Sequence, residues 1–291
     1  MQYGNIQPSF DVEAATHEEA MELGLQRLKV LWDRTATKPL EIERQGPAPV
    51  ATPQGVLKRC RVSGTEVIFD PVAHTYHDHQ GNRYMGGSTF AAKYKSKFAA
   101  DTISGKMAEK AAVDAQQILD MWALNAEASA TFGTSVHAAL QLYGEYVELS
   151  RAIKGGSDES ALTSNPVLRP IVEKFFTEER KREKAFYEEF VADAKLRHCG
   201  LIDRLVAEDD GLWVEDFKTN ASVEKSETIL KPFKGVVPNT ALGAYWLQLS
   251  FYARILAAAG RTVKGLRVHH YTGGDWVTHE HEVVDLSEAL S

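Results

Sequence analysis

The amino-acid sequence predicts an α/β domain in which helices flank one mixed β-sheet. Short β-prone segments are preceded and followed by long stretches of helical composition. An Asp-Asp-Gly turn at 209–211 joins two of the β-prone segments as an antiparallel pair. With 44% hydrophobic residues in 291, the chain has ordinary globular composition and can bury a sizeable core.

The N-terminal part of the chain predicts an appendage to this domain. Apolar residues recur at helical spacing over 11–34, with Asp11 as the N-cap, which indicates one amphipathic helix. The next stretch, 37–55, contains four prolines and few core-forming residues, so it is typical of a linker. We therefore expect an N-terminal helix and linker over 1–58 and the main domain over 59–291.

The first half of the main domain is expected to be mostly helical after a small hairpin or meander. Residues 97–130 are rich in Ala, Lys and Met and contain almost no helix breakers. A further helix is expected to begin at 133–137, where Thr134 or Ser135 is available as the N-cap and His137 would project from the first turn. The short strands before these helices are expected at 61–69, 74–79 and 82–86.

The second half is rich in strands. Asn165-Pro166 opens another helix, and a strong helix is expected at 240–259. Strands are expected at 183–194, 196–209, 212–220, 261–272 and 275–286.

Two carboxylates and one amine are predicted to meet in the hairpin around 209–211. Residues equally distant from the turn pair across an antiparallel hairpin, so Asp203 lies nearly opposite Asp216, and Lys218 shares a face with Asp216. Adjacent strands are roughly 4.8 Å apart, which allows two carboxylates to share one divalent ion. The carbonyl of Phe217 is a further candidate ligand.

This set suits phosphodiester hydrolysis. Hard oxygen ligands hold magnesium or manganese, the metal polarises the phosphate and activates water, and the ammonium stabilises developing charge. Taken alone, however, the pattern also fits charged residues that alternate on a solvated strand. Likewise His137 alone fits a packed or solvated helix residue, and Gln248 and Tyr252, one turn apart on the helix at 240–259, fit an ordinary amphipathic face.

Four motifs considered together and in order are more specific. They are GTSVH at 133–137, GLIDRL at 200–205, WVEDFKT at 213–219 and QLSFY at 248–252. This series resembles the RecB-like branch of the PD-(D/E)XK nuclease superfamily, whose motifs read GTxxH, GxxD, (D/E)xK and QxxxY. The resemblance covers about residues 60–285. The segment HTYHDHQGNRY and the following Ser88-Thr89 are also similar to the lead-in of RecB-like exonucleases encoded by bacteriophages.

The resemblance implies a restriction-endonuclease-like core and a role for each matching residue. Lys218 would be the catalytic lysine, acting with Asp203 and Asp216. Gln248 and Tyr252 would line the cleft and contact nucleic acid or brace Lys218. One or two Mg²⁺ or Mn²⁺ ions would be held by three side chains and one carbonyl, those of His137, Asp203, Asp216 and Phe217.

Two positions match the family less closely. Glu189, on the strand before the hairpin, corresponds to a less constant acidic position that would orient a metal-bound water. Gln141 stands where many relatives carry Glu, four residues after the motif histidine, so a second metal would be held more weakly. Glu145, one turn further, is a candidate substitute.

DNA contacts are expected from local lysines, because a net charge of −7 argues against a broad electrostatic grip on nucleic acid. A segment at 93–110 interleaves lysines with Tyr94 and Phe98, and a loop after the Lys218 strand carries more. A soluble helix surface explains the first segment equally well. The candidate lysines are Lys93, Lys95, Lys97, Lys225, Lys231 and Lys234.

Several other classes are disfavoured. Cys60 and Cys199 are too few for an iron–sulfur cluster or a disulfide framework. The sequence contains no apolar run that spans a membrane, no signal peptide and no phosphate-binding GxxxxGK[ST] motif, so a cytoplasmic protein without a helicase motor is expected. The histidine clusters at 74–79 and 269–281 are expected to be solvated rather than zinc-binding.

The sequence therefore predicts a metal-dependent DNA nuclease, with an exonuclease in recombination or repair as the preferred reading. The alternatives are a structure-specific or single-strand endonuclease with the same site, a non-catalytic nucleic-acid-binding or inhibitor-binding module that keeps the fold, and an unrelated metallohydrolase. The N-terminal appendage is a candidate contact for a recombinase, a single-strand-annealing protein or a single-strand-binding protein.

Overall fold

A computed structural model describes residues 55–152 and 165–290 of the chain. The helix predicted at 11–34 lies outside these residues, as does the proline-rich segment up to residue 54. Within the described ranges, no helix combines the length and the apolar character needed to cross a membrane.

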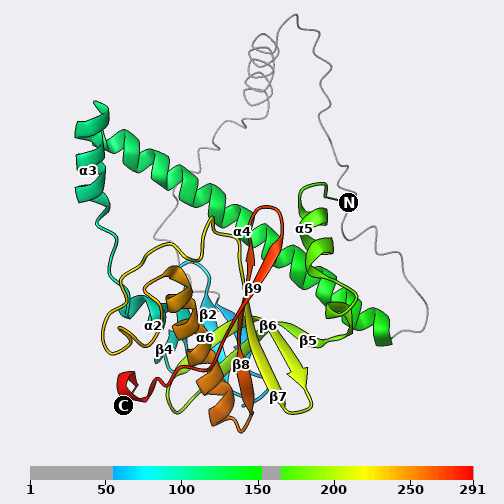
Figure 1. Ribbon diagram of the computed structural model, residues 1–291. Coiled ribbons are helices and arrows are strands. Elements are labelled where there is room, and N and C mark those ends of the chain that lie inside the picture. Colours follow the sequence, from blue (N-terminus) through cyan, green and yellow to red (C-terminus); the bar gives the residue numbers. More distant parts are fainter. Residues whose placement is uncertain (1–54, 153–164, 291) are drawn as a thin grey trace, which may run out of the picture. The chain divides into compact units, whose positions relative to one another are not determined.

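One mixed sheet of nine strands forms the centre of the described chain (Figure 1). The strand order is β1-β2-β3-β4-β6-β7-β8-β9, and β5 pairs with the second edge of β6. The β4–β6 and β7–β8 pairs are parallel and the others are antiparallel. The bounds are β1 Val56–Arg59, β2 Glu66–Asp70, β3 Thr75–His77, β4 Arg83–Gly86, β5 Lys184–Asp193, β6 His198–Glu208, β7 Gly211–Lys218, β8 Val263–Tyr271 and β9 Trp276–His281.

Helices cover both faces of this sheet. The core cluster on one face includes α2 and α6, and the cluster on the other includes α4 and α5. This arrangement confirms the predicted α/β class and is consistent with a restriction-endonuclease-like core. The helices are α2 Gly87–Lys93, α3 Ala100–Ala111, α4 Ala115–Ala152, α5 Leu168–Phe175 and α6 Ala241–Ala258, with short 3-10 turns η2 Arg180–Arg182 and η3 Ser287–Ala289. β1 begins at Val56, so three residues assigned to the linker join the sheet.

The helix α6 is buried on almost every side. Thirteen of its 18 residues are buried, including Trp246, Phe251 and Tyr252. A helix that is apolar all round is stable only inside a core. This explains why α6 can hold a few polar side chains in fixed positions beneath the sheet.

The prediction that a helix begins at 133–137 is wrong, because this segment lies in the middle of the 38-residue α4. The alanine-rich stretch before it contains no helix breaker, so the helix simply continues. Ser135 does not cap a terminus; its hydroxyl donates to the Thr131 carbonyl at 2.9 Å. Gly133 allows a close approach instead, since a Cβ there would lie 3.0 Å from Thr219 Oγ1.

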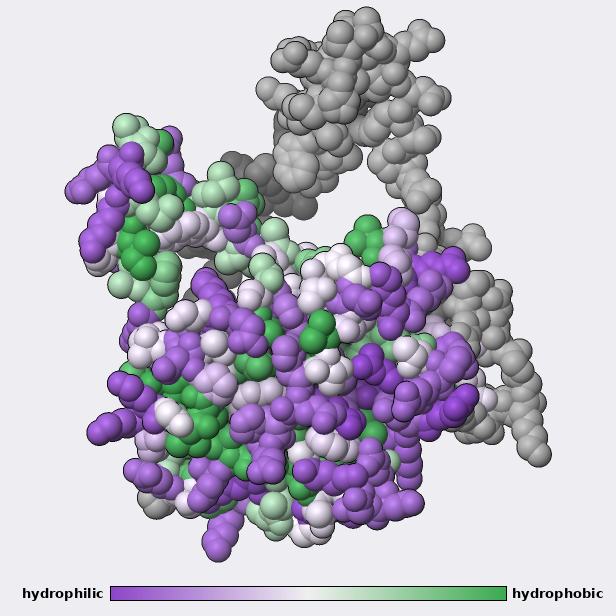
Figure 2. Space-filling view, viewed as in Figure 1, coloured by the Kyte–Doolittle hydropathy of each residue, from purple (hydrophilic) through white to green (hydrophobic). Residues whose placement is uncertain are grey.

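The end of α4 that begins at Ala115 packs against α3 and has an apolar surface. Residues 98–131 contribute nothing to the three core clusters of the described chain. Phe98 contacts Trp122 with ring centroids 5.5 Å apart. Figure 2 shows hydrophobic side chains gathered over α3 and this end of α4, where the exposed large hydrophobic residues are Phe98, Ile103, Met107, Val113, Met121 and Leu124.

The hairpin of β6 and β7 has the predicted turn and register. Asp209 and Asp210 form the turn, and Glu208 pairs with Gly211. The ladder continues to the pair of Arg204 with Glu215, so the next residues along, Asp203 and Asp216, follow on opposite strands. The local turn and the period of two therefore specify this part of the fold.

The sheet forks beside the hairpin. One edge of β6 pairs with β5 along nearly its whole length. The other edge pairs with β4 at its start, at His198 and Cys199, and with β7 only from Arg204 onward. Residues 200–203 thus pair with no described strand on that side, and side chains such as those of Asp203 and Tyr252 lie there instead.

The alternation of side chains also shifts at this fork. Ile202 and Leu205 both lie in the core cluster that includes α6, although residues three apart in a regular strand point to opposite faces. The β5–β6 ladder skips the pair of Glu188 with Asp203, and Glu188 has a φ of 49°. This distortion lies at Glu188 and Asp203, the two acidic residues of the skipped pair.

Candidate active site

Asp203 connects three elements at the fork. Its Oδ2 accepts a hydrogen bond of 2.8 Å from the Phe217 main-chain N–H and lies 3.3 Å from Nδ1 of His137. The Asp203 side chain thereby takes the place of a ladder bond between β6 and β7 and ties both to α4. His137, although predicted in a first helical turn, reaches Asp203 from the middle of α4.

Asp216 and Lys218 form the second part of the site. The Lys218 ammonium is in contact with Asp216 Oδ2, and both side chains are largely buried. The ring of Tyr245, on α6, lies on the ammonium with its centroid 4.7 Å from Nζ. The sequence indicated the shared face of Asp216 and Lys218 but gave no signal for Tyr245.

Gln248 and Tyr252 lie one turn apart on α6. Gln248 Nε2 donates a long hydrogen bond of 3.4 Å to the Tyr252 hydroxyl. The Tyr252 ring is enclosed by two glycines, since a Cβ on Gly87 or Gly200 would lie 2.3 or 2.1 Å from its Cε1. Burial, with Asp216 and Asp203 nearby, raises the pKa of Tyr252 well above its usual value, so the phenol stays protonated.

The acidic residue on β5 that reaches the site is Glu188, not Glu189 as expected. Glu188 lines the pocket that also contains His137 and Lys218. Glu189 is buried elsewhere and its Oε2 lies 3.6 Å from Arg61. Simple alternation along β5 could not choose between the neighbours, because the strand is distorted at Glu188.

A cavity of about 640 Å³ is bordered by His137, Glu188, Lys218 and Tyr245. The side chains of Asp203 and Asp216 lie behind this lining, and Gln248 and Tyr252, contrary to expectation, do not line the cavity. One wall is a single face of α4, and the opposite wall is formed by Tyr245 and by residues 217–220 at and after the end of β7. Gln141 is part of the α4 wall and donates to Glu145 Oε1 at 2.9 Å. The α4 residues of the wall are Ser129, Ala130, Gly133, Thr134, His137, Ala138 and Gln141.

Nearby positive charge does not offset the effect of burial on every carboxylate of the site. Burial raises the pKa of Asp216 to about 6, against the effect of Lys218, and nearby Asp203 adds to the increase. Burial also raises the pKa of Glu188 to about 7, again with a contribution from Asp203. Burial opposes ionisation of Asp203 too, but the hydrogen bond and charge of His137 hold its pKa below the usual value.

A divalent cation fits this donor set by chemistry. In the described part of the chain, no three His, Cys, Asp or Glu side chains already stand close enough to enclose a metal ion. Carboxylate and carbonyl oxygens are nevertheless the ligands that Mg²⁺ and Mn²⁺ prefer. Burial, with Asp203 nearby, raises the pKa values of Asp216 and Glu188, and a bound cation would lower them by favouring the ionised carboxylates.

The candidate DNA-binding lysines lie away from this cavity. None of the six is among the residues that line it. Lys95 pairs with Glu227 at 3.0 Å, and Lys93 borders a different hollow near β4. The two basic segments do run together, however, because residue 95 forms a β-bridge with Ile229 and Leu230 N–H donates to the Tyr94 carbonyl at 2.8 Å.

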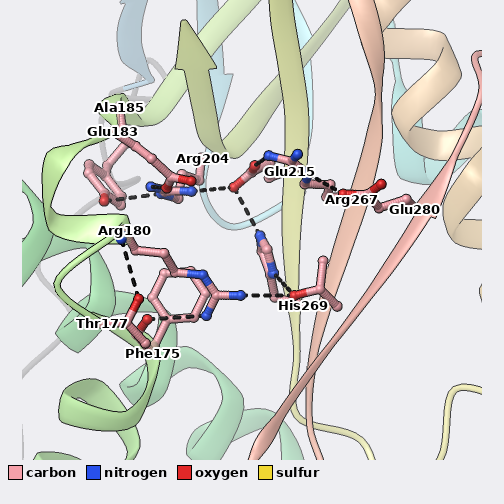
Figure 3. A network of polar contacts seen from close by, with 12 residues as sticks. Phe175, Thr177, Arg180, Glu183, Ala185, Arg204, Glu215, Arg267, His269 and Glu280 are labelled. Atoms are coloured by element: carbon pink, nitrogen blue, oxygen red, sulfur yellow. Dashed lines mark hydrogen bonds and ion pairs between the residues drawn. The ribbon is translucent and has the colours of Figure 1, made fainter. Parts of the chain in front are cut away.

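A network of buried charges lies on the face of the hairpin opposite α6 (Figure 3). Arg204 donates to Glu215 at 2.5 Å and also contacts Glu183. His269 lies 2.9 Å from the same Glu215 carboxylate and is only 2% exposed. The expectation that the histidines of 269–281 are solvated is therefore wrong for His269, and likewise for His270, whose Nε2 contacts the Asn220 carbonyl at 2.7 Å.

A family model described as the PD-(D/E)XK nuclease superfamily matches residues 114–274, more than half of the chain. The matched range contains α4, the β5–β7 strands and α6, and thus all the candidate catalytic and metal-binding residues. No curated protein matches the chain.

Proposed function

The chain belongs to the PD-(D/E)XK nuclease superfamily, and we propose that it is a RecB-like, metal-dependent DNA exonuclease whose active site is the cavity at the β6–β7 fork. The observation that carries this proposal is the meeting of Asp203, Asp216 and Lys218 on two adjoining strands. The order of the four motifs supports the RecB-like assignment.

Each residue has a role that follows from its surroundings. Asp203 and Asp216, with the Phe217 carbonyl and His137, would hold one or two Mg²⁺ or Mn²⁺ ions. A bound ion would polarise the phosphate and lower the pKa of water. Lys218 stays protonated, since burial opposes the charge but Asp216 and Asp203 raise its pKa, and its ammonium would stabilise charge on the phosphate.

Glu188 and the α6 residues complete the centre. With a pKa raised to about 7 by burial, Glu188 can accept a proton from the attacking water at neutral pH. Gln248 and Tyr252 hold the α6 side of the site in place. The adjoining lysine segments around Lys95 and the loop at 225–234 would contact the DNA backbone.

Cleavage of linear duplex DNA with Mg²⁺, with Mn²⁺ and with EDTA tests the proposed reaction. We expect Lys218→Ala to lower kcat at least about a hundredfold, because a preorganised positive charge at the phosphate is lost. Lys195→Ala, at an exposed turn outside the site, should retain wild-type activity. Equal cleavage by wild type and Lys218→Ala, or full activity in EDTA, would contradict the proposal.

The exonuclease assignment has its own test. A covalently closed circle offers no end, so we expect linear DNA to be degraded to nucleotides or short oligonucleotides while the circle persists. Cleavage of both substrates at similar rates would instead identify an endonuclease that uses the same residues.

A further inference from the structure

Tyr245 lies beside the predicted catalytic lysine, Lys218, and takes no part in the roles proposed above. It lies on α6 one turn before Gln248 and two turns before Tyr252, so the three share a helix face. It is half-buried and forms part of the cavity wall. Its ring centroid is 4.7 Å from Lys218 Nζ, within the range of a cation–π contact.

The Lys218 head group has few other restraints. A lysine side chain has four methylenes and many rotamers, and its ammonium makes no bidentate contact that would fix its direction. Asp216 attracts it from one side. The Tyr245 ring lies on the ammonium as well, so the carboxylate and the ring together define one position for the amine.

We propose that Tyr245 is a positioning residue that holds the Lys218 ammonium at the cavity through the face of its ring. This inference rests on the proposed nuclease function. The ring is the essential feature, since burial raises the pKa of the Tyr245 phenol and keeps it neutral, so it adds no charge of its own. If Tyr245 only filled space in the cavity wall, leucine at this position would serve as well.

Steady-state cleavage of linear DNA by Tyr245→Phe and Tyr245→Leu separates these roles. We expect Tyr245→Leu to lower kcat about tenfold with KM changed less than about twofold, the size of a partly desolvated cation–π contact. Tyr245→Phe should keep kcat within about threefold of wild type, because the ring face is retained. Wild-type kcat in Tyr245→Leu, or equal losses in Phe and Leu variants, would overturn the proposal.

A second readout needs neither metal nor activity. Metal-free protein is treated briefly with acetic anhydride, and acetylation of Lys218 is quantified by mass spectrometry. Removal of the ring should uncover the amine and increase Lys218 labelling several-fold in Tyr245→Leu but not in Tyr245→Phe. If Tyr245→Leu does not fold, Lys218 labelling is measured in Tyr245→Gln instead, with the same expected increase. Unchanged labelling would overturn the proposal.

Tyr271→Leu is the matched control, since Tyr271 is half-buried on β8, packs on Trp276 and does not line the cavity. It should change neither kcat nor Lys218 labelling. If wild type itself cleaves no DNA with either metal, the proposed function fails. If wild type cleaves and Tyr245→Leu matches it, only the role of Tyr245 fails.

Discussion

Glu188 and Glu189 show how strongly the surroundings of a single residue determine its chemistry. Both are glutamates on β5, one residue apart. Glu188 lies at the cavity, where burial and Asp203 raise its pKa to about 7. Glu189 is paired with Arg61 away from that cavity, although burial raises its pKa as well. Of the two, only Glu188 is placed to take part in the proposed reaction.

Exchange of each glutamate for glutamine provides a matched comparison. We expect Glu188→Gln to lower activity about 10- to 100-fold, because a carboxylate that supports metal or water is lost. Glu189→Gln should stay within about threefold of wild type. The measurement is the initial rate of DNA cleavage, with thermal melts to confirm that both variants fold. A larger loss in Glu189→Gln would reverse this assignment.

The raised pKa values also predict how metal binding depends on pH. Asp216, whose pKa is raised to about 6, and Glu188, whose pKa is raised to about 7, bind protons more tightly in the folded than in the unfolded protein. Without metal, this stabilises the fold at low pH, and the contribution is lost as pH rises through these values. Because metal must displace those protons, the increase in Tm caused by Mn²⁺ should be larger at about pH 8 than at about pH 5.5.

Differential scanning fluorimetry at fixed Mn²⁺ concentration measures this effect. Asp216→Asn removes one titrating ligand, so both the increase in Tm and its pH dependence should shrink. An increase that is the same at both pH values would count against carboxylate ligation at the fork.

At the scale of elements, the site depends on how closely α6 approaches the sheet. The ring of Tyr252 occupies the space that side chains would take at Gly87 on α2 and Gly200 on β6. The glycine of the GLIDRL motif is therefore explained by packing, three residues before Asp203 on the same strand. The spacing between α6 and the sheet therefore sets the geometry of the proposed active site through the contact of Tyr252 with Gly200.

Gly200→Ala should destabilise the protein by about 1–3 kcal/mol, because the added Cβ overlaps the buried Tyr252 ring. Gly105→Ala is the control, since nothing lies within 4 Å of a Cβ at this position in α3. At position 105 the higher helix propensity of alanine should stabilise the protein by roughly 0.5–1 kcal/mol. Urea unfolding measures both values, and an unchanged midpoint for Gly200→Ala would refute the packing argument.

At the scale of the whole described domain, the charge network of Figure 3 joins strands that are far apart in the sequence. Glu215 on β7 contacts Arg204 on β6 and both Arg267 and His269 on β8. Arg204 is next to Asp203 on β6, and Glu215 is next to Asp216 on β7. Arg204 and Glu215 pair with each other in the β6–β7 ladder. The network thus lies on the same two strands as the proposed catalytic groups.

A double-mutant cycle on Arg204 and Glu215 tests how this network contributes to stability. Arg204→Met leaves the buried Glu215 with only Arg267 and His269, and Glu215→Leu leaves the buried Arg204 with only Glu183. Each variant alone should therefore destabilise the protein by up to about 3–5 kcal/mol, because a buried charge loses its closest partner. The loss of unfolding free energy in the double variant should be clearly smaller than the sum of the two single losses, because neither charge remains. Denaturant unfolding gives the three values, and strict additivity would show that the pair does not act as a unit.

The sequence by itself determined the α/β class, the β6–β7 hairpin with its register, α6, and the order of the motifs. Each depends on a local turn such as Asp209-Asp210-Gly211, on side-chain period or on residue identity, all of which are written in neighbouring residues. The tertiary structure alone decided that α4 continues through His137, that Glu188 rather than Glu189 lines the cavity, and that the Tyr245 ring lies on Lys218. These outcomes depend on contacts between segments far apart in the chain, where packing at the fork overrides local propensity and strand alternation.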